Sequence, residues 1–331
     1  HVRSRRQRQM CIRDRPKGLS LFLVPKVLPD GSRNAVVCER IEEKMGLHGS
    51  PTCVMRFDDA TGWLVGEPNK GLNAMFVMMN AARLHVGLQG IGLLEAAWQK
   101  ASAYAAERRQ MRAPGAKDTS LIQDHPAIRR ILHTQRAWID GGRVLAYHTA
   151  LQLDVAKHSS DAGERAAAQR WCALVTPVLK AALTDQAFHG ASACLQVFGG
   201  HGYVREWGIE QIVRDARVAM IYEGTNEIQA IDLLVRKVLA DGGQGLGALL
   251  GSLPGAAPSA AASARRHALV EITQTMAIAA QSDPELPYWV ADDYLRAVAL
   301  VLLEWAWAQI GAARPHRAEP VSYTHLTLPT T

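Results

Sequence analysis

Long stretches with apolar residues at helical spacing constrain this chain more than any other feature of its sequence. Over residues 83–111, large apolar side chains recur every three or four positions, as Leu84, Leu88, Ile91, Leu94 and Trp98. Similar spacing appears over 124–158, 161–198 and 228–239. Only 6% of the residues are aromatic and alanine is abundant, which favours packed helices over sheets. The sequence therefore predicts a mostly α-helical protein built around a four-helix bundle.

Proline and glycine residues refine this prediction. Pro126 falls near the first position of the second helix, where proline is favoured. Pro177 lies inside the third helix and is expected to kink it. Gly87, Gly90 and Gly92 would weaken an isolated helix, so we expect them to allow close packing between helices.

The segments on either side of the bundle have different patterns. Residues 16–70 contain short apolar runs between turn signals, which predicts part of a β-domain before a bundle over 71–241. Residues 242–262 are rich in Gly, Ala, Pro and Ser and predict a linker. Residues 263–313 show helical spacing again and predict a small helical C-terminal extension.

The two ends of the sequence, residues 1–15 and 314–331, resemble translated sequencing-adapter read-through at the ends of assembled metagenomic fragments. We expect both to be artefactual tails that take no part in the fold, and the gene to be cut short upstream. Six arginines in the first tail supply much of the net charge of +6, so the charge predicts no nucleic-acid partner.

Cysteine usage and hydropathy limit the class of protein. The five cysteines are scattered, without a Cys-x-x-Cys pair or a nearby histidine cluster, so we expect no metal site and no disulfide framework. This usage fits a reducing cytoplasm. The apolar run 298–303 is short and is followed by Glu304, so we expect no membrane insertion.

One turn combines several residues that could take part in binding or catalysis. Residues 221–229 read Ile-Tyr-Glu-Gly-Thr-Asn-Glu-Ile-Gln. Thr225 suits the N-cap of the following helix, and Glu227 suits its first turn, where a negative charge is favourable. Glu223 precedes that helix and could act as a base, while Gly224 would let a flat ligand group approach the backbone. Most charged loop residues are solvated, so on its own Glu223 also fits an ordinary solvated glutamate.

Three ordered blocks of sequence point to a family. Residues 196–203 read Gln-Val-Phe-Gly-Gly-His-Gly-Tyr, 214–217 read Arg-Asp-Ala-Arg, and 221–228 read Ile-Tyr-Glu-Gly-Thr-Asn-Glu-Ile. Together they resemble the C-terminal helical domain of the acyl-CoA dehydrogenases. Segments within 21–58 resemble the latter part of that family's central β-domain. The extension and residues 79–84 resemble its 3-methylmercaptopropionyl-CoA dehydrogenase subgroup.

The resemblance implies FAD-dependent α,β-dehydrogenation of an acyl-CoA thioester to the 2-enoyl-CoA. Glu223 matches the family's catalytic base, which acts with hydride transfer to flavin N5, and its backbone N–H matches a donor to the thioester oxygen. Arg83 matches the arginine near that glutamate, and we expect Arg83 and Gly224 on the substrate side. The alternative for Arg83 is a solvated cation at a helix start.

The same resemblance implies contacts with FAD. Six positions match cofactor-contacting residues of the family: Arg108, Gln196, Gly199, Gly200, Thr225 and Glu227. Arg108 matches an arginine that reaches the FAD pyrophosphate of a neighbouring subunit, where a guanidinium can form paired hydrogen bonds. The alternatives are a solvated charge for Arg108 and helix capping for the others. We also expect Arg214, Asp215 and Arg217 to form an ion-pair network in the loop before Glu223.

Partners and competing functions follow from the same resemblance. It implies an acyl-CoA substrate, an electron-transfer flavoprotein and a homodimer or homotetramer. An acyl-CoA oxidase using molecular oxygen would need the same base, whereas a non-catalytic helical assembly module would keep the fold without turnover. The intact Glu223-Gly224-Thr225 sequence argues against the module. We expect this chain alone to be inactive, because the family's first helical domain and half of its β-domain are missing.

Overall fold

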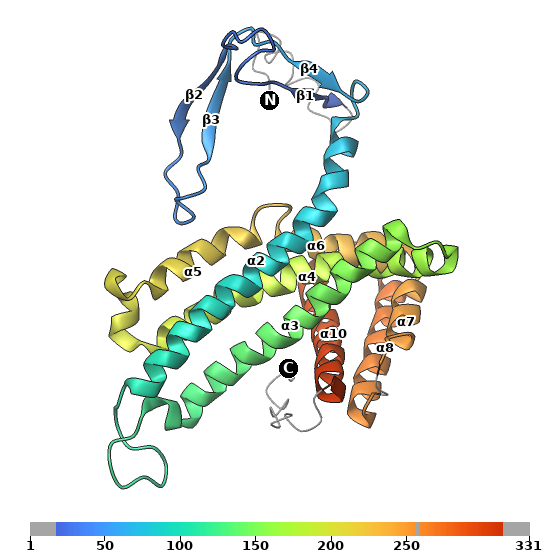
Figure 1. Ribbon diagram of the computed structural model, residues 1–331. Helices are drawn as coiled ribbons and strands as arrows, with labels where there is room; N and C mark the ends of the chain where they lie inside the picture. Colours follow the sequence, from blue (N-terminus) through green and yellow to red (C-terminus); the bar gives the residue numbers. More distant parts are fainter. Residues whose placement is uncertain (1–17, 256–257, 314–331) are drawn as a thin grey trace. The chain divides into compact units, whose positions relative to one another are not determined.

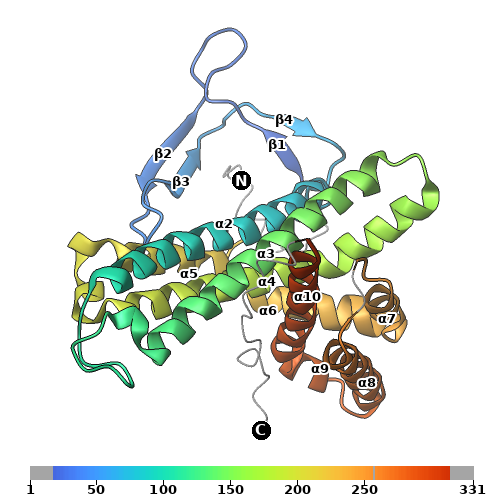
Figure 2. The same cartoon turned by 60° about the horizontal axis from the view of Figure 1, so that its bottom comes forward.

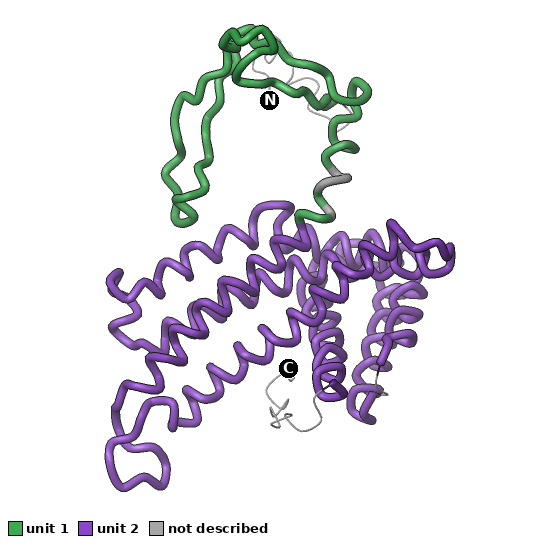
Figure 3. The backbone as a smooth tube through the Cα atoms, viewed as in Figure 1, with its two compact units in different colours: residues 1–82 green, residues 83–331 purple. Residues whose placement is uncertain are grey.

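The structure, a computed structural model, describes residues 18–255 and 258–313 (Figure 1). The two tails that we expected to be artefactual lie outside these residues. The described chain forms two compact units that divide between Ala82 and Arg83 (Figure 3).

The first unit holds two separate antiparallel pairs of strands. Strand β1 (Leu21–Leu23) pairs with β4 (Trp63–Val65), and β2 (Val36–Ile41) pairs with β3 (Cys53–Phe57). The buried Asn34 joins them, because its Nδ2 donates to the carbonyls of Pro25 and Thr61, both at 2.8 Å. These strands form the small β portion that the sequence predicted.

The second unit is helical, which confirms the predicted fold class. Three long helices dominate it: α2 (Gly71–Glu107, from Arg83 onward), α3 (Pro126–His158) and α4 (Ala162–Val197). Figures 1 and 2 show them lying side by side. Helix α3 begins at Pro126, as expected. Asp161 caps α4 by accepting a hydrogen bond from the Glu164 N–H at 2.8 Å, and Pro177 lies inside α4.

Two glycines bring α2 against α4. A Cβ atom built on Gly90 would lie 2.9 Å from the carbonyl oxygen of Leu183, and one on Gly87 would lie 3.3 Å from that of Leu179. This close packing therefore depends on the absence of a side chain at both positions. The same prediction for Gly92 was wrong, since a Cβ there would meet no described atom within 4 Å.

The region after α4 contains a helix that the sequence analysis missed. Helix α5 (Ile209–Arg217) covers the residues expected to form an ion-pair loop. Within it, the Arg214 Nε lies 2.6 Å from the Glu210 Oε2, one helical turn earlier. Ile209 at the start of α5 and Ala216 near its end are buried, which the charged residues of this segment do not reveal.

Helix α6 (Asn226–Leu233) follows, and its path continues through a π-helical turn, Leu234–Val238, and a 3₁₀ turn, Leu239–Asp241. The sequence predicted one uninterrupted helix over 228–239. The change of helix type occurs where Leu233, Leu234 and Val238 are all buried.

The remaining helices are α7 (Gln244–Gly251), α8 (Ala260–Ser282), α9 (Leu286–Trp289) and α10 (Ala291–Ala313). The predicted linker therefore contains a helix, α7, whose Leu246, Leu249 and Leu250 are buried. Helix α10 packs on α3, α4 and α6, so residues 263–313 share the hydrophobic core of the bundle.

Helix α10 is the one helix in the described ranges that is long and apolar enough to cross a membrane by length and composition alone. Its buried residues include Leu295, Val298, Leu302 and Trp305, all in the core cluster shared with the long helices. This packing accounts for its apolar composition.

Candidate functional site

The structure divides the nine predicted site residues into two groups. Four of them line one pocket: Arg108, Gln196, Gly199 and Gly200. The other five lie at or beside the turn that leads into α6: Arg83, Glu223, Gly224, Thr225 and Glu227.

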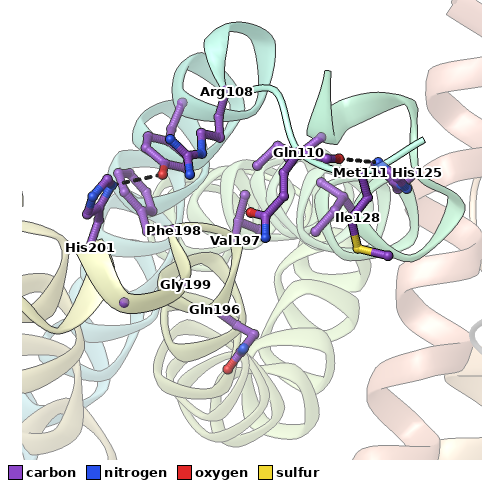
Figure 4. Close-up of a pocket in the computed structure, with 13 residues that line it drawn as sticks. Arg108, Gln110, Met111, His125, Ile128, Gln196, Val197, Phe198, Gly199 and His201 are labelled. Carbon is purple, nitrogen blue, oxygen red and sulfur yellow. Dashed lines mark hydrogen bonds between the residues drawn. The ribbon is translucent and has the colours of Figure 1, made fainter. Parts of the chain in front are cut away.

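The pocket is a cavity of about 500 Å³ between the end of α2, the loop that joins α2 to α3, and the end of α4 (Figure 4). A 3₁₀ turn, Gly199–Tyr203, forms part of its wall. Its size lies within the range of about 300–1,000 Å³ that is usual for small-molecule sites. Resemblance in the sequence identified Arg108 and the glycines but not the cavity, because residues 108 and 196 are far apart in the chain.

Aromatic side chains that the sequence analysis did not select support the pocket wall. The Tyr104 ring stacks on Phe198 with centroids 4.3 Å apart, and the Tyr104 hydroxyl lies 3.0 Å from His201 Nδ1. His201 also stacks on Trp207. On the opposite side, His125 Nε2 lies 3.0 Å from the Gln110 carbonyl oxygen (Figure 4). No spacing in the sequence connects these residues.

The exposed groups of the pocket suit an anionic, extended ligand. Gly199 has a φ of +57°, and a Cβ built on Gly199 or Gly200 would meet no described atom within 4 Å. Both glycine backbones therefore face open space. The Arg108 guanidinium is exposed beside them and could form paired hydrogen bonds with a phosphate.

The second group is organised by the turn at Glu223. Thr225 is the N-cap of α6, and its Oγ1 accepts a hydrogen bond from the Ile228 N–H at 3.4 Å. Glu227 lies in the first turn of α6, as the sequence predicted. Glu223 is half-buried and precedes the helix with a φ of +57°, followed by Gly224 with a φ of +87°. Two successive residues are thus left-handed, a conformation that is disfavoured for the non-glycine Glu223.

Two buried side chains hold the carbonyl groups of this turn. Lys180 of α4 donates to the Gly224 carbonyl at 2.8 Å and to Asn226 Oδ1 at 3.0 Å. Gln229 Nε2 donates to the carbonyls of Glu223 and Gly224 at 3.3 and 3.4 Å. Neither Lys180 nor Gln229 was predicted as part of the site. A lysine inside an apolar helix was the only sequence signal that could have identified Lys180.

The electrostatics of the turn centre on Lys180, which is fully buried. Burial lowers the pKa of Lys180 to about 8, because the charged form loses its hydration. The carboxylates of Glu227 and Glu223 oppose this change, and the cation of Arg83 adds to it. Hydrogen bonding to Thr225 is the main cause that lowers the pKa of Glu227.

Arg83 lies beside the turn and is not a solvated surface cation. Only 11% of its side chain is exposed, and its Nη1 lies 3.9 Å from Asp232 Oδ2 of α6. Its Nη2 lies 3.9 Å from the position of a Cβ built on Gly224. Arg83 therefore brings positive charge next to the Glu223–Gly224 peptide.

No cluster of His, Cys, Asp or Glu within the described ranges could hold a metal ion.

Comparison with known proteins gives the family of this helical unit. Residues 69–238, about half of the chain, match the family described as "Acyl-CoA dehydrogenase, C-terminal domain". The chain belongs to the acyl-CoA dehydrogenase family. The matched residues include both groups of the candidate site, so the family relationship applies to the pocket and to the turn.

Curated relatives in this family match over a larger part of the chain. It is 46% identical to the 3-methylmercaptopropionyl-CoA dehydrogenase of Ruegeria pomeroyi over 235 residues, which is 69% of this chain and 40% of that protein. It is 38% identical to a broad-specificity linear acyl-CoA dehydrogenase of Mycobacterium tuberculosis over 253 residues, with 70% and 40% covered. The chain thus spans about 40% of the length of these relatives.

Solved structures of the family show the same fold. A butyryl-CoA dehydrogenase from Megasphaera elsdenii aligns with a TM-score of 0.54 and 25% identity, over 67% of this chain and 52% of that one. An acyl-CoA dehydrogenase from Bacillus anthracis, solved in complex with FAD, aligns with a TM-score of 0.71 and 23% identity, over 91% and 53%. At 23% identity the second comparison supports the fold alone.

Proposed function

We propose that the whole protein to which this chain belongs is an FAD-dependent acyl-CoA dehydrogenase in which Glu223 is the catalytic base. One observation carries the proposal: Glu223 stands at the head of α6 on a turn whose carbonyls are fixed by Lys180 and Gln229. A base must be held within reach of one C–H bond, and a fixed turn provides this.

In this proposal the Glu223 carboxylate removes the α-proton of the acyl-CoA thioester. The charge that develops on the thioester oxygen needs hydrogen-bond donors, and the Glu223 N–H is the donor that this chain would supply. The absence of a side chain at Gly224 leaves room for the thioester group beside the backbone. Arg83, nearly buried next to Gly224, adds positive charge to this region.

The pocket at the end of α4 fits the phosphate-bearing part of FAD. Arg108 would bind the pyrophosphate, and the accessible backbones of Gly199 and Gly200 would lie against the dinucleotide. Gln196 and, at the head of α6, Thr225 and Glu227 complete the proposed cofactor contacts. The chemistry that FAD supplies when bound is two-electron oxidation, with N5 as the hydride acceptor.

Further parts of the proposal concern partners. We propose an acyl-CoA substrate, with a second copy of the protein completing the cofactor site as a homodimer or homotetramer. An electron-transfer flavoprotein is the proposed electron acceptor. Relatives named as dehydrogenases favour this acceptor over molecular oxygen. We also propose a cytoplasmic location, from the cysteine usage alone.

The variant Glu223→Gln in the whole protein tests the proposed base. The amide keeps the size of the side chain but cannot accept the α-proton. We expect FAD to remain bound and the bleaching of its absorbance by acyl-CoA to slow by about 10²–10⁴-fold. The matched control is Glu271→Gln on α8, which changes an exposed glutamate in the same way and should bleach at the wild-type rate. Wild-type bleaching by Glu223→Gln would place the base elsewhere.

A further inference from the structure

The turn at Glu223 needs support from outside its own sequence. Glu223 and Gly224 have φ angles of +57° and +87°, and the left-handed region is unfavourable for a residue with a side chain. Such a conformation persists only where the surrounding contacts over-determine it. The support therefore has to come from groups that bind the peptide groups of these two residues.

Lys180 is the charged group that does so from a different element. It projects from α4, is fully buried, and donates to the Gly224 carbonyl and to the Asn226 side chain. A lysine is almost never fully buried unless its charge is compensated, because loss of hydration is costly. Here both acceptors lie within residues 224–226. Contacts with the turn thus offset part of the cost of burying this cation.

The rest of the network ties Asn226 to α4. Asn226 Nδ2 donates to the Ala181 carbonyl at 3.1 Å, and Thr184 Oγ1 lies 3.2 Å from Asn226 Oδ1. All the α4 residues in this network, Lys180, Ala181 and Thr184, lie within about one helical turn of each other. Gly87 and Gly90 allow α2 to pack against this same stretch of α4.

We propose that Lys180 is a positioning residue that fixes the Gly224 carbonyl and thereby holds Glu223 in its left-handed conformation with its carboxylate aimed at the substrate. The effect of Lys180 on the conformation of the turn is independent of the proposed function, whereas its effect on catalysis rests on that function. The charged groups that face Lys180 are Glu227, Arg83 and Glu223. Lys180 does not touch the reacting atoms.

Amide hydrogen exchange on this chain tests the positioning directly. The variant Lys180→Met removes both hydrogen bonds and keeps most of the side-chain volume. The amides of Tyr222, Ile228 and Gln229, which bond to Val218 and Thr225 in and around the turn, should exchange at least tenfold faster. Amides in α3 should keep their wild-type rates.

Lys237→Met is the matched control. Lys237 also donates to a carbonyl of α4, that of Ala173 at 2.7 Å, but makes no contact with residues 222–229 among the described hydrogen bonds and ion pairs. Its loss should leave exchange at the turn within twofold of wild type. Lys180→Gln, which keeps a neutral donor, should lie between wild type and Lys180→Met.

Two results would overturn the proposal. One is a folded Lys180→Met chain whose turn exchanges within twofold of wild type. The other is failure of both Lys180→Met and Lys180→Gln to fold, since Lys180 would then serve the whole bundle and not the turn.

The whole protein provides the functional readout. Lys180→Met should lower kcat at least tenfold while KM for acyl-CoA and FAD content stay within about threefold, because a misplaced base affects the reaction step more than binding. Unchanged kcat would contradict the role. If Glu223→Gln bleaches normally, the proposed function fails, yet the exchange experiment still reports on the turn, so the two failures can be told apart.

Discussion

The pocket at Gly199 and Gly200 and the turn at Glu223 are built by opposite means. In the pocket the two glycine backbones and the Arg108 guanidinium are exposed, and the supporting contacts are aromatic stacks behind the wall. At the turn, the backbone carbonyls are already bonded by buried side chains from α4 and α6. One region presents exposed groups that can bind a ligand, whereas the other has a conformation that its own buried side chains fix.

This difference matches the two tasks that we propose. A cofactor can supply its own shape, so a binding surface needs exposed donors and space. A general base must keep its geometry within a fraction of an ångström through the reaction, so its backbone has to be rigid. Substitutions in the two regions should therefore have different consequences for stability and for ligand binding.

The largest effect in this comparison is expected from adding a methyl group to the turn. Gly224→Ala places a Cβ on a residue with a φ of +87°, a backbone conformation that is unfavourable for alanine. The Cβ would also lie 2.7 Å from Gln229 Nε2 and would displace this donor from the Glu223 carbonyl. We expect a loss of about 1–3 kcal/mol in the free energy of unfolding of this chain, measured in urea.

The matched variant in the pocket is Gly200→Ala, whose Cβ would enter open space. Its free energy of unfolding should stay within about 0.5 kcal/mol of wild type, while the affinity of the whole protein for FAD should fall. Equal losses of stability in the two alanine variants would remove the distinction between the regions.

A loss of similar size is expected where α2 packs on α4. Gly90→Ala puts a Cβ 2.9 Å from the Leu183 carbonyl and should cost about 1–3 kcal/mol in unfolding free energy, because the two backbones must separate. The exposed Gly92→Ala should instead be stabilising by about 0.5–1 kcal/mol through helix propensity.

Hydrogen exchange would then sharpen the comparison. Leu179 and Leu183 lie on either side of Lys180 in the sequence, so Gly90→Ala should also speed exchange at the Glu223 turn. Exchange of the pocket residues 198–203 should change less. Faster exchange in the pocket than in the turn would show that α4 does not transmit the disturbance as we expect.

The smallest effect concerns pH. The pKa of Lys180 is lowered to about 8 in the folded chain, against an ordinary value of 10.5. Between these values the unfolded chain binds more protons, so folding becomes more favourable as pH rises. The unfolding free energy of the wild-type chain should therefore increase relative to Lys180→Met from about pH 8 upward. Parallel curves for the two proteins would show that burial does not lower the pKa of Lys180 in the folded chain.

The fold was largely predictable where periodicity was long and unbroken. Helix α3 ends at the predicted residue and starts two residues later than the predicted range, and α4 differs by one residue at each end. The short helices α5 and α7 were missed, because α5 reads as a charged loop and α7 contains three glycines. Their helical state depends on burial of a few residues against the bundle, which a local pattern does not contain.

The candidate site was only partly predictable for the same reason. Glu223 and the paired glycines were identified because they lie in short blocks of sequence that resemble the family, and Arg108 was identified by the same resemblance. Lys180 and Gln229 were not identified, since their roles arise from packing of α4 against the turn. The aromatic wall of the pocket likewise joins residues almost a hundred positions apart, as in Tyr104 and His201.

The most direct test of the proposed division of tasks compares Glu223→Gln with Arg108→Met in the whole protein, measuring bound FAD and the rate of its bleaching by acyl-CoA. We predict that Glu223→Gln keeps its FAD and bleaches about 10²–10⁴-fold more slowly. Arg108→Met should bind FAD more weakly yet bleach at nearly the wild-type rate once saturated. Rapid bleaching by Glu223→Gln, or the same loss of FAD in both variants, would contradict the account.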